Sequence, residues 1–454
     1  MAEQIFQLPR LPRLIERRGA LRHIPGSDSY LELVHLLREP MGFFHERFNR
    51  YGRVFKTRLI YPVVFLVGAD ANRTLMITQR HAFSFGRGYA QTAVNRIFEG
   101  SIMLQDGEEH QRTRDILSPA VGRLAVRESA ERVYDIWSGA VRRAMDGSSH
   151  DVYTVAQRAT FDVAANALTG LELHDGTSDT IRPLFEDLIE GIMSATSVRF
   201  PRGRLDRALN AREQLKSVLR PQILKARCGE GTGLLGQLAH HRDGKGRLLE
   251  PDAVTEHLLL LFWAGYDTTA SSAAWVLHML GQRVDWQKRL RAELDEVVGD
   301  AALDIEARNR ELPLLNAFLF EIERMYPSAL FFPRIATEAI HYEGYAIPKG
   351  TPVFYSPYMT HRDPELFDNP NTFDPDRWDK SQPGGRNARP SALVGFGGGP
   401  RICLGKTFAK LQLKLMMHAI LSQSRINPDP LSRTTIQGVP VHHPNGSRIF
   451  FESV

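Results

Sequence analysis

The chain has 454 residues, of which 43% are hydrophobic and 24% charged, an ordinary balance for a globular protein with a large core. Its net charge of +5 is spread along the chain without long runs of like charge, which argues against a nucleic-acid-binding tail. The two cysteines, Cys228 and Cys403, are too few for a disulfide framework, so we expect a reducing, cytoplasmic location.

The first 35 residues are not a signal peptide, because they lack a continuous apolar segment and a small-residue cleavage site. Neither they nor the rest of the chain contain the roughly 20 apolar residues of a transmembrane helix. The leucines near the N-terminus suit a membrane surface, but the prolines and arginines among them favour a strap across the protein body. We therefore expect a strap over residues 1–35 and a single domain over residues 36–454.

A helix and a hairpin are predicted next. Residues 43–51 have the spacing of an amphipathic helix. Residues 54–60 and 63–67 are rich in strand-forming side chains and flank Tyr61 and Pro62, which predicts a β-hairpin.

Residues 108 to about 299 follow mainly helical periodicity, divided by glycines and prolines. The segment after Pro251 stands out, because apolar and small residues continue from there to about Gly281. A helix of some 30 residues spans about 45 Å, the width of a domain. A helix so long and apolar must run through the protein core.

The C-terminal part mixes short strands, an irregular segment and one more helix. Residues 340–354 alternate as short strands do, and residues 357–389 are rich in Pro, Asp and Asn. Residues 406–421 are helical, and residues 448–452 are strand-like. These elements predict a mainly α-helical α+β protein, with β-rich parts near residues 52–68 and 335–356 and helical parts near residues 107–326 and 404–421.

The most informative segment is the glycine-rich stretch FGGGPRICLG. It places Phe396, three glycines from Gly397 onward, Arg401, Cys403 and Gly405 in a fixed order. A lone cysteine is usually a small buried side chain, but coincidence does not account for so many fixed positions. The stretch is not a phosphate-binding loop, because the Lys-Ser/Thr ending of that motif is missing.

This pattern resembles the haem-binding signature of the cytochrome P450 family, the standard example of haem iron held by a cysteine thiolate. The resemblance implies that family's fold, a triangular helical prism with a long central helix over haem b, and makes Cys403 the iron ligand. The glycines, including Gly397, let the backbone aim N–H groups at the sulfur, and the following helix favours the thiolate through its dipole. Gly405 leaves room for the porphyrin, Phe396 packs on its sulfur side, and Arg401 reaches a propionate.

A second motif, AGYDTT, resembles the oxygen-activation motif of the family. Ala264 and Gly265 are small enough to let the helix approach a flat cofactor. Thr268 lies four residues after Ala264 on the same face, and its hydroxyl can bond back to the Ala264 carbonyl. We expect Thr268 and Asp267 to deliver protons; the alternative is a packing contact between small residues.

Three further residues match a structural network of the family. Glu321 and Arg324 share one helix face at i,i+3 spacing. The segment FDPDRW supplies Arg377. The resemblance implies that the three together hold the cysteine loop in place.

Propionate contacts are expected from His110 and Arg114, four residues apart on a helix, and from Arg334. Each position matches a frequent propionate partner in the family. The alternative for each is a solvated side chain.

The expected substrate pocket is mostly apolar, which suits a medium-to-large lipophile. Fatty acids, terpenoids, steroids and polyketides all remain open. Besides the loop between about residues 83 and 104, the expected lining is Leu261, Ala264, Thr268, Ala329, Leu330, Phe331, Phe332 and Val441.

The resemblance implies a monooxygenase that inserts one oxygen atom of O2 by hydroxylation or epoxidation. The sequence has no flavin or iron–sulfur motif, so electrons from NAD(P)H are expected through a ferredoxin or flavodoxin with its reductase. The excess of basic residues is either scattered or gathered into a patch for an acidic electron carrier. We assign no chemistry to Cys228, His361 or the pair His442 and His443.

Three alternatives stay open. A peroxide-using or isomerase haem-thiolate enzyme usually alters the acid–alcohol pair, which is intact here in Asp267 and Thr268. A haem carrier or gas sensor does not need that pair. A haem-free helical binding protein is the third alternative.

Overall fold

The structure is a computed structural model that describes residues 21–454 except 91, 172–176, 193, 195–198, 231–232, 243–245, 300, 380–390 and 440. Most of the expected N-terminal strap therefore lies outside the described residues.

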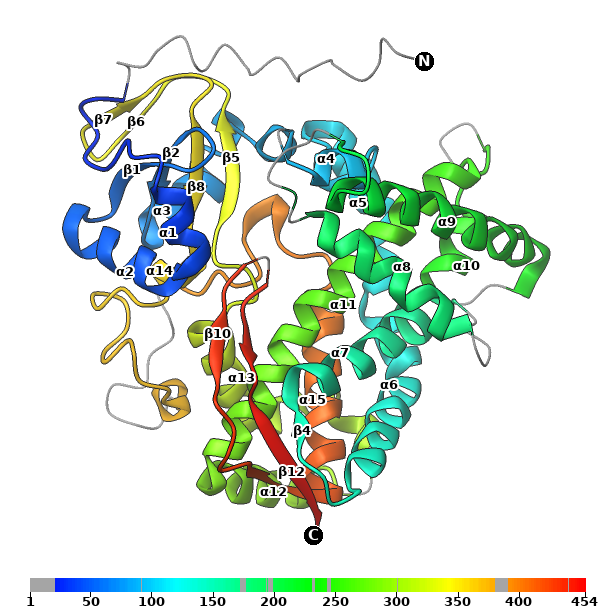
Figure 1. The fold of residues 1–454 in the computed structure, drawn as a ribbon. Helices are drawn as coiled ribbons and strands as arrows, with labels where there is room; N and C mark the ends of the chain where they lie inside the picture. The colour runs from blue at the N-terminus through cyan, green and yellow to red at the C-terminus, as the bar shows by residue number, and fades with distance from the viewer. Residues whose placement is uncertain are drawn as a thin grey trace.

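Helices dominate the described chain and small sheets accompany them, which confirms the predicted class (Figure 1). The α-helices are α1 (Glu32–Arg38), α2 (Pro40–Tyr51), α3 (Ala69–Arg73), α4 (Val94–Ile97), α5 (Gly107–Leu117), α6 (Arg123–Ala144), α7 (Val152–Val163), α8 (Thr177–Ile192), α9 (Arg204–Lys225), α10 (Gly233–His240), α11 (Pro251–Gln282), α12 (Val284–Val297), α13 (Pro313–Met325), α14 (Pro357–Thr360) and α15 (Lys406–Gln423).

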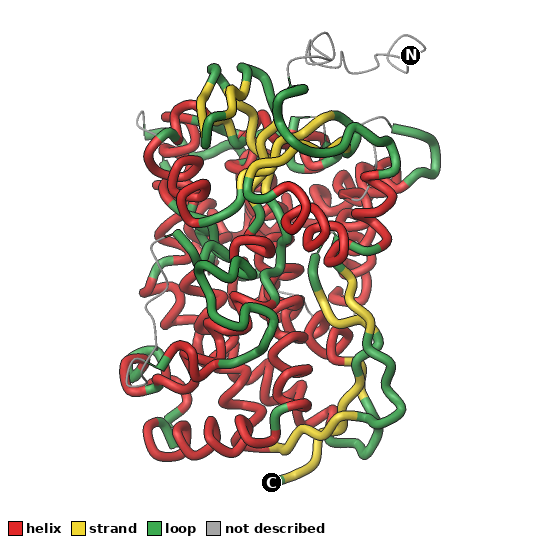
Figure 2. Tube along the Cα trace, turned by 90° about the vertical axis from the view of Figure 1, so that its left-hand side faces the viewer, coloured by secondary structure: helices red, strands yellow, loops and turns green. Residues whose placement is uncertain are grey.

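The largest sheet has the strand order β1-β2-β8-β5-β3, with β2 and β8 parallel although they lie far apart in the sequence. Figure 2 shows the strands gathered at one end and along one edge of the helical body. The strands are β1 (Val54–Arg58), β2 (Pro62–Leu66), β3 (Phe83–Ser84), β4 (His150–Asp151), β5 (Phe332–Ala336), β6 (Ile340–Tyr342), β7 (Tyr345–Ile347), β8 (Pro352–Tyr355), β9 (Ser424–Pro428), β10 (Thr435–Gln437), β11 (His443–Asn445) and β12 (Arg448–Ser453).

The predicted hairpin, the strands within residues 340–354 and the C-terminal strand are present, with ends that differ by one or two residues. The predicted β-rich part began at residue 335, whereas β5 begins at Phe332 and contains Pro333, a residue that central strands seldom contain. Pro333 fits because β5 pairs antiparallel with β8 on one side and only briefly with β3 on the other.

The long helix α11 runs through the middle of the molecule, as its composition predicted (Figure 1). Most of its side chains are buried on every side. Trp275 on α11 belongs to one core cluster with Trp137 of α6 and Trp286 of α12. The helix is therefore held rigidly enough to position a site.

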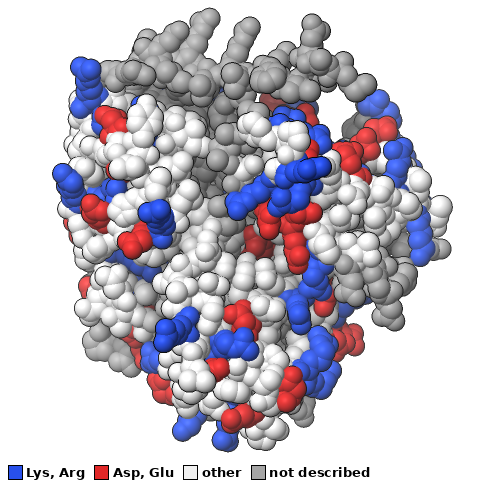
Figure 3. All heavy atoms as spheres, in the orientation of Figure 1, with Lys and Arg blue, Asp and Glu red and all other residues white. Residues whose placement is uncertain are grey.

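On the face drawn in Figure 3, Lys and Arg side chains lie among Asp and Glu side chains and do not form one basic area. This favours scattered basic residues over a patch on that face. In the part of the chain that the structure describes, no helix has both the length and the apolar character to cross a bilayer.

Candidate functional site

A tight loop before α15 positions Cys403. The Cys403 N–H donates a hydrogen bond to the Phe396 carbonyl oxygen at 2.8 Å, which closes the loop. Gly397 and Gly399 have φ values of 69° and 58°, in the left-handed region that favours glycine. A Cβ on Gly399 would also clash with the carbonyl of Met76, so the backbone there approaches too closely for any side chain.

The sulfur of Cys403 is accessible and has open room beside it. The residue is accessible by surface area, yet burial raises the pKa of its thiol. The thiol is thus accessible although much protein lies around it. A hydrogen bond from Gly405 and the charges of Arg114 and Lys406 lower that pKa, whereas Glu323 raises it. A Cβ on Gly405 would meet no atom within 4 Å, so there is room beside the sulfur for a flat cofactor.

Helix α11 carries the second polar group that the sequence predicted for the site. The Thr268 hydroxyl donates to the Ala264 carbonyl oxygen at 2.6 Å, the hydrogen bond that the sequence predicted. The Thr268 carbonyl accepts in turn from the Ser328 hydroxyl at 2.9 Å. Leu404, which follows Cys403, packs against the core cluster that contains residues 258–262 of α11. Leu404 and this part of α11 therefore belong to one core region.

Asp267 is buried and points toward α7. Its Oδ1 accepts a hydrogen bond from the Tyr153 hydroxyl at 3.3 Å, and no hydrogen bond between described residues joins it to Thr268. Burial raises the pKa of Asp267 to about 6, although Tyr153 and Trp263 lower it. The carboxyl group can therefore take up and release a proton close to neutral pH.

The four residues expected at the propionates lie close enough for their charges to influence one another. They are Arg401, Arg334, Arg114 and His110. Burial lowers the pKa of Arg401 to about 10, with Asp106 opposing and the charges of Arg334 and Arg114 adding to the effect. The pKa of His110 is lowered to about 4, mainly by burial and further by the positive charges of Arg401 and Arg114. The structure thus brings the predicted basic side chains together, and their excess of positive charge suits carboxylate groups.

Asp106 belongs to the same cluster and was not predicted. Its carboxylate accepts from Arg401 Nη2 at 2.7 Å, from the Ser84 hydroxyl and from the Phe85 N–H at 3.0 Å. Arg401 also donates to the Gln105 carbonyl. The guanidinium of Arg401 is therefore oriented by groups of the protein. Because Asp106 neutralises only one of the arginines, the cluster as a whole stays positively charged.

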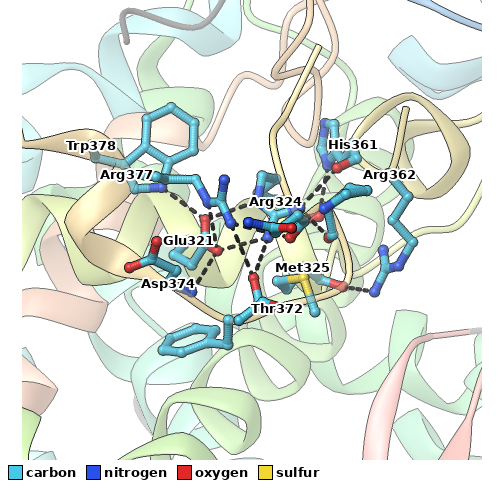
Figure 4. A network of polar contacts seen from close by, with 12 residues as sticks. Glu321, Arg324, Met325, His361, Arg362, Thr372, Asp374, Arg377 and Trp378 are labelled. Atoms are coloured by element: carbon cyan, nitrogen blue, oxygen red, sulfur yellow. Dashed lines mark hydrogen bonds and ion pairs between the residues drawn. The ribbon is translucent and has the colours of Figure 1, made fainter. Parts of the chain in front are cut away.

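Glu321, Arg324 and Arg377 form the buried network drawn in Figure 4. Arg324 donates to both carboxylate oxygens of Glu321, at 2.7 and 2.8 Å, and both side chains are fully buried. Arg377 Nε donates to Glu321 at 3.0 Å. The N–H of Asp374 and the indole of Trp378, which the sequence did not predict, donate to the same carboxylate.

His361 connects this network to the cysteine loop. Its Nε2 accepts from the Val394 N–H at 2.9 Å, so its Nδ1 carries the hydrogen and donates to the Arg324 carbonyl at 3.0 Å. Val394 lies two residues before Phe396, whose carbonyl holds the Cys403 N–H. His361 therefore has a structural role.

The expected pocket residues do not all share one surface. Leu330 and Phe331 lie in the aromatic core cluster of α2, β2 and β8, where Phe331 stacks on Phe354 at 5.6 Å. Leu330 is buried in that core and offers little surface to a substrate, whereas Phe331 is half-buried and its contact with a substrate stays a prediction. Phe332 stacks on Tyr355 at 5.2 Å.

The other lining candidates keep places near α11 or the C-terminal hairpin. Leu261 is buried among the residues that surround the first half of α11, Ala329 is half-buried, and Val441 is buried beside β11. Trp263, which the sequence did not select, is half-buried and stacks on Phe98 at 4.9 Å.

Gly265 and Phe396, both predicted to contact the cofactor, also have close neighbours within the chain. A Cβ on Gly265 would come 2.7 Å from the side chain of Leu168 in η7 (Ala164–Thr169), so the missing side chain makes room for that helix. The ring of Phe396 lies under the ammonium groups of Lys406 and Lys410, at 5.6 and 5.5 Å. Cys228 is exposed.

The donor set fits a haem better than a directly bound metal. Among the described residues, no three His, Cys, Asp or Glu side chains are grouped to hold a metal ion. A single accessible thiol, room beside it and a cluster of basic groups fit a porphyrin with an iron and two propionates. The fold and site thus define a haem-thiolate protein.

Comparison with known proteins places the chain in a family. A family model described as Cytochrome P450 matches residues 29–438, so the chain belongs to the cytochrome P450 family. It is 31% identical over 389 residues to "Putative cytochrome P450 120" of Synechocystis, covering 84% of this chain and 85% of that protein. The solved structure "Retinoic acid bound cyanobacterial CYP120A1" matches with a TM-score of 0.84 and 28% identity, covering 95% of this chain and 99% of that one.

Plant hydroxylases are similar as well. Taxane 10-beta-hydroxylase of Taxus cuspidata is 28% identical, covering 95% of this chain and 90% of that protein. Abscisic acid 8'-hydroxylase 4 of Arabidopsis thaliana is 27% identical, covering 88% and 86%. The protein is accordingly a cytochrome P450 monooxygenase, an oxidoreductase whose haem iron is bound by a thiolate.

Proposed function

We propose that Cys403 holds the iron of haem b and that the protein hydroxylates or epoxidises a lipophilic small molecule. The observation that carries this assignment is the accessible thiol of Cys403 with open room beside it at Gly405, in a chain whose helix α11 makes the predicted hydrogen bond from Thr268 to Ala264. When bound, haem supplies the activation of O2 and the transfer of one oxygen atom to the substrate.

The residues of the chain bind and orient the cofactor. Cys403 binds as a thiolate, and the Gly405 N–H stabilises its negative charge. The basic cluster binds the propionates, with Asp106 orienting Arg401. The Glu321 network keeps the loop in place through His361.

Proton delivery belongs to α11. Asp267 takes up a proton near neutral pH and releases it toward the oxygen-binding side. The hydrogen bond to Ala264 fixes the Thr268 hydroxyl, which passes the proton on.

The substrate is proposed to be a medium-to-large lipophile of terpenoid type. Abscisic acid, taxanes and retinoic acid appear in the names of the similar proteins. The apolar and aromatic side chains near α11, among them Leu261, Trp263 and Phe98, suit such a molecule.

Electrons are proposed to come from NAD(P)H through a ferredoxin or flavodoxin with its reductase. Lys406, at the start of α15 beside the cysteine loop, suits the acidic surface of such a carrier, whereas Lys410 is paired with the largely buried Glu323. The low cysteine count supports a cytoplasmic location, and we propose that residues 36–454 act as one domain.

The test begins with the carbon-monoxide difference spectrum of the reduced protein. We expect the red-shifted band of thiolate ligation, and its loss in Cys403→Ser; a band that survives this substitution would exclude Cys403 as the ligand. Turnover of abscisic acid, retinoic acid and a taxane is then compared with NADPH, ferredoxin and reductase, and with peroxide alone. Faster turnover with peroxide alone would favour the peroxide-using alternative.

A further inference from the structure

The carboxylate of Asp267 has one hydrogen-bond donor of defined geometry in the described part of the chain, and the indole of Trp263 beside it also lowers its pKa. That donor is the hydroxyl of Tyr153 on α7, at 3.3 Å from Oδ1. The other oxygen, Oδ2, is shut off from solvent without a partner. Asp267 itself is 3% exposed. The Tyr153 hydroxyl therefore has a large influence on this carboxylate, because the group is buried and Oδ2 has no hydrogen-bond partner among the described residues.

Tyr153 is held so that its hydroxyl keeps this direction. Its ring stacks on the imidazole of His443 in β11, with 3.6 Å between the ring centres and 7° between the planes. The His443 Nδ1 is 3.1 Å from the Val441 carbonyl, which fixes the imidazole in turn. The C-terminal hairpin thus clamps the ring of Tyr153 from outside α7.

The charged and titratable groups around Asp267 come from three elements. On α11, Tyr266 and Trp263 flank it; on α7, only Tyr153 bonds to it. From β11, His443 stands behind Tyr153, and burial lowers the pKa of His443 to about 4, so this histidine is neutral. No positive side chain is among the causes that shift the pKa of Asp267. Neutral donors, not an ion pair, therefore stabilise the charged form.

Tyr153 cannot itself exchange the proton. Burial and the charge of Asp267 raise the pKa of its phenol far above the ordinary value. Tyr153 therefore keeps its hydrogen while Asp267 gains and loses a proton. Its contribution is a hydrogen bond to the charged form of Asp267 only.

We propose that Tyr153 is a positioning residue for proton delivery, which holds the Asp267 carboxylate on the α7 side and sets its proton affinity. This rests on the proposed role of Asp267. Because the hydroxyl stabilises the carboxylate, removing it makes Asp267 a weaker acid. A single hydrogen bond to a charged group corresponds to a shift of about one pKa unit.

The test is an infrared pH titration of the purified haem-bound protein. Asp267→Asn assigns the carboxyl band by removing it, and the wild-type band is expected to titrate near pH 6. In Tyr153→Phe, which keeps the stacked ring, the titration should move up by about one unit. Tyr266→Phe is the matched control: it removes a buried phenol hydroxyl next to Asp267 that makes no hydrogen bond to it, so the titration should move far less.

A second variant guards against misfolding of the first. His443→Leu keeps the Tyr153 hydroxyl but removes the stacked ring, so we expect a smaller shift in the same direction. An Asp267 titration that stays unchanged in Tyr153→Phe would overturn the inference.

The pH profile of NADPH-driven turnover separates this inference from the proposed function. Its acid limb should move by the same amount as the infrared titration. A moved titration with an unmoved profile would remove Asp267 from proton delivery, and with it the functional part of the inference. Loss of the thiolate spectrum in the unsubstituted protein would instead sink the proposed function.

Discussion

Replacing Glu321 by glutamine should destabilise the protein more than any other isosteric change in its network. The substitution keeps the shape of the side chain and removes one negative charge. Among the described residues, the Glu321 carboxylate accepts five hydrogen bonds, two of them from the fully buried guanidinium of Arg324. In Glu321→Gln, one of the carboxylate oxygens becomes an amide that faces donors, and Arg324 keeps a buried charge without a counter-charge.

The expected loss is about 3–5 kcal/mol of the free energy of unfolding, as when one partner of a buried ion pair is removed. Folded domains are stable by only about 5–15 kcal/mol, so this is a large share. Trp378→Phe gives the scale of one neutral donor. It removes a single indole hydrogen bond of 2.9 Å from the same carboxylate, and should cost about 1 kcal/mol.

The assay is urea unfolding of the haem-bound proteins, followed by circular dichroism and by the Soret band. The midpoint should fall much further in Glu321→Gln than in Trp378→Phe. The spectrum of the folded fraction should keep its thiolate character, because Glu321 does not touch the iron. If the two variants lost equal stability, or Glu321→Gln lost less than 1 kcal/mol, the charge of Glu321 would not be what stabilises the network.

Three further predictions concern the site. Because burial raises the pKa of Asp267 from 3.8 to about 6, the free energy of unfolding is highest below pH 3.8 and falls as the pH rises through about 6. Asp267→Asn should therefore increase the free energy of unfolding by roughly 3 kcal/mol at pH 7 and leave it unchanged at pH 3. Equal increases at the two pH values in thermal unfolding would contradict this. Gly405→Ala should leave the stability of the apoprotein unchanged but lower its haem content, because the added methyl group meets only the open room beside the sulfur. Gly399→Ala should instead destabilise the apoprotein by more than about 1 kcal/mol, because Gly399 has a left-handed backbone and no room for a side chain. If Gly405→Ala bound haem as well as the unsubstituted protein in a titration, the porphyrin would have to lie elsewhere. Asp106→Asn should raise the haem reduction potential in a spectroelectrochemical titration, because it removes a negative charge from the basic cluster; an unmoved potential would place that cluster away from the haem.

Local spacing predicted the parts of the site that a single segment determines. The Thr268 hydroxyl reaches the Ala264 carbonyl because a helix brings residues i and i+4 together, and the pattern alone is sufficient for that. The order of residues around Cys403 likewise determines a loop in which glycines adopt left-handed backbone angles.

Contacts between distant segments were not predictable in this way. Asp106 and Arg401 are separated by 295 residues, and Tyr153 and Asp267 by 114. Nothing in the sequence near Asp106 distinguishes it from an ordinary residue before a helix. Its role arises from the fold, which places the start of α5 against the cysteine loop.

Phe331 shows a different limit. An aromatic residue after the buried helix α13 suits either a substrate pocket or a core, since both are apolar. The outcome depended on β5, which pairs with β8 and carries the preceding residues toward the aromatic cluster of α2 and β2. The predicted β-rich part began only at residue 335, so the sequence did not show that Phe331 leads directly into a strand of this sheet.

A series of hydrogen bonds connects Arg324 to the loop of Cys403, and only part of this series is predictable from local sequence patterns. Sequence motifs identify its ends, Arg324 and Cys403, but the connecting groups are His361 and the backbone from Val394 to Phe396. His361 carries no signal of its own, because a buried histidine is recognisable only through the two backbone groups it joins. Each link is one hydrogen bond of ordinary strength, and all of them hold main chain. The position of the sulfur therefore depends on main-chain contacts whose partners a motif search does not include, and a substitution at His361 should disturb the cysteine loop although it touches neither end of the pattern.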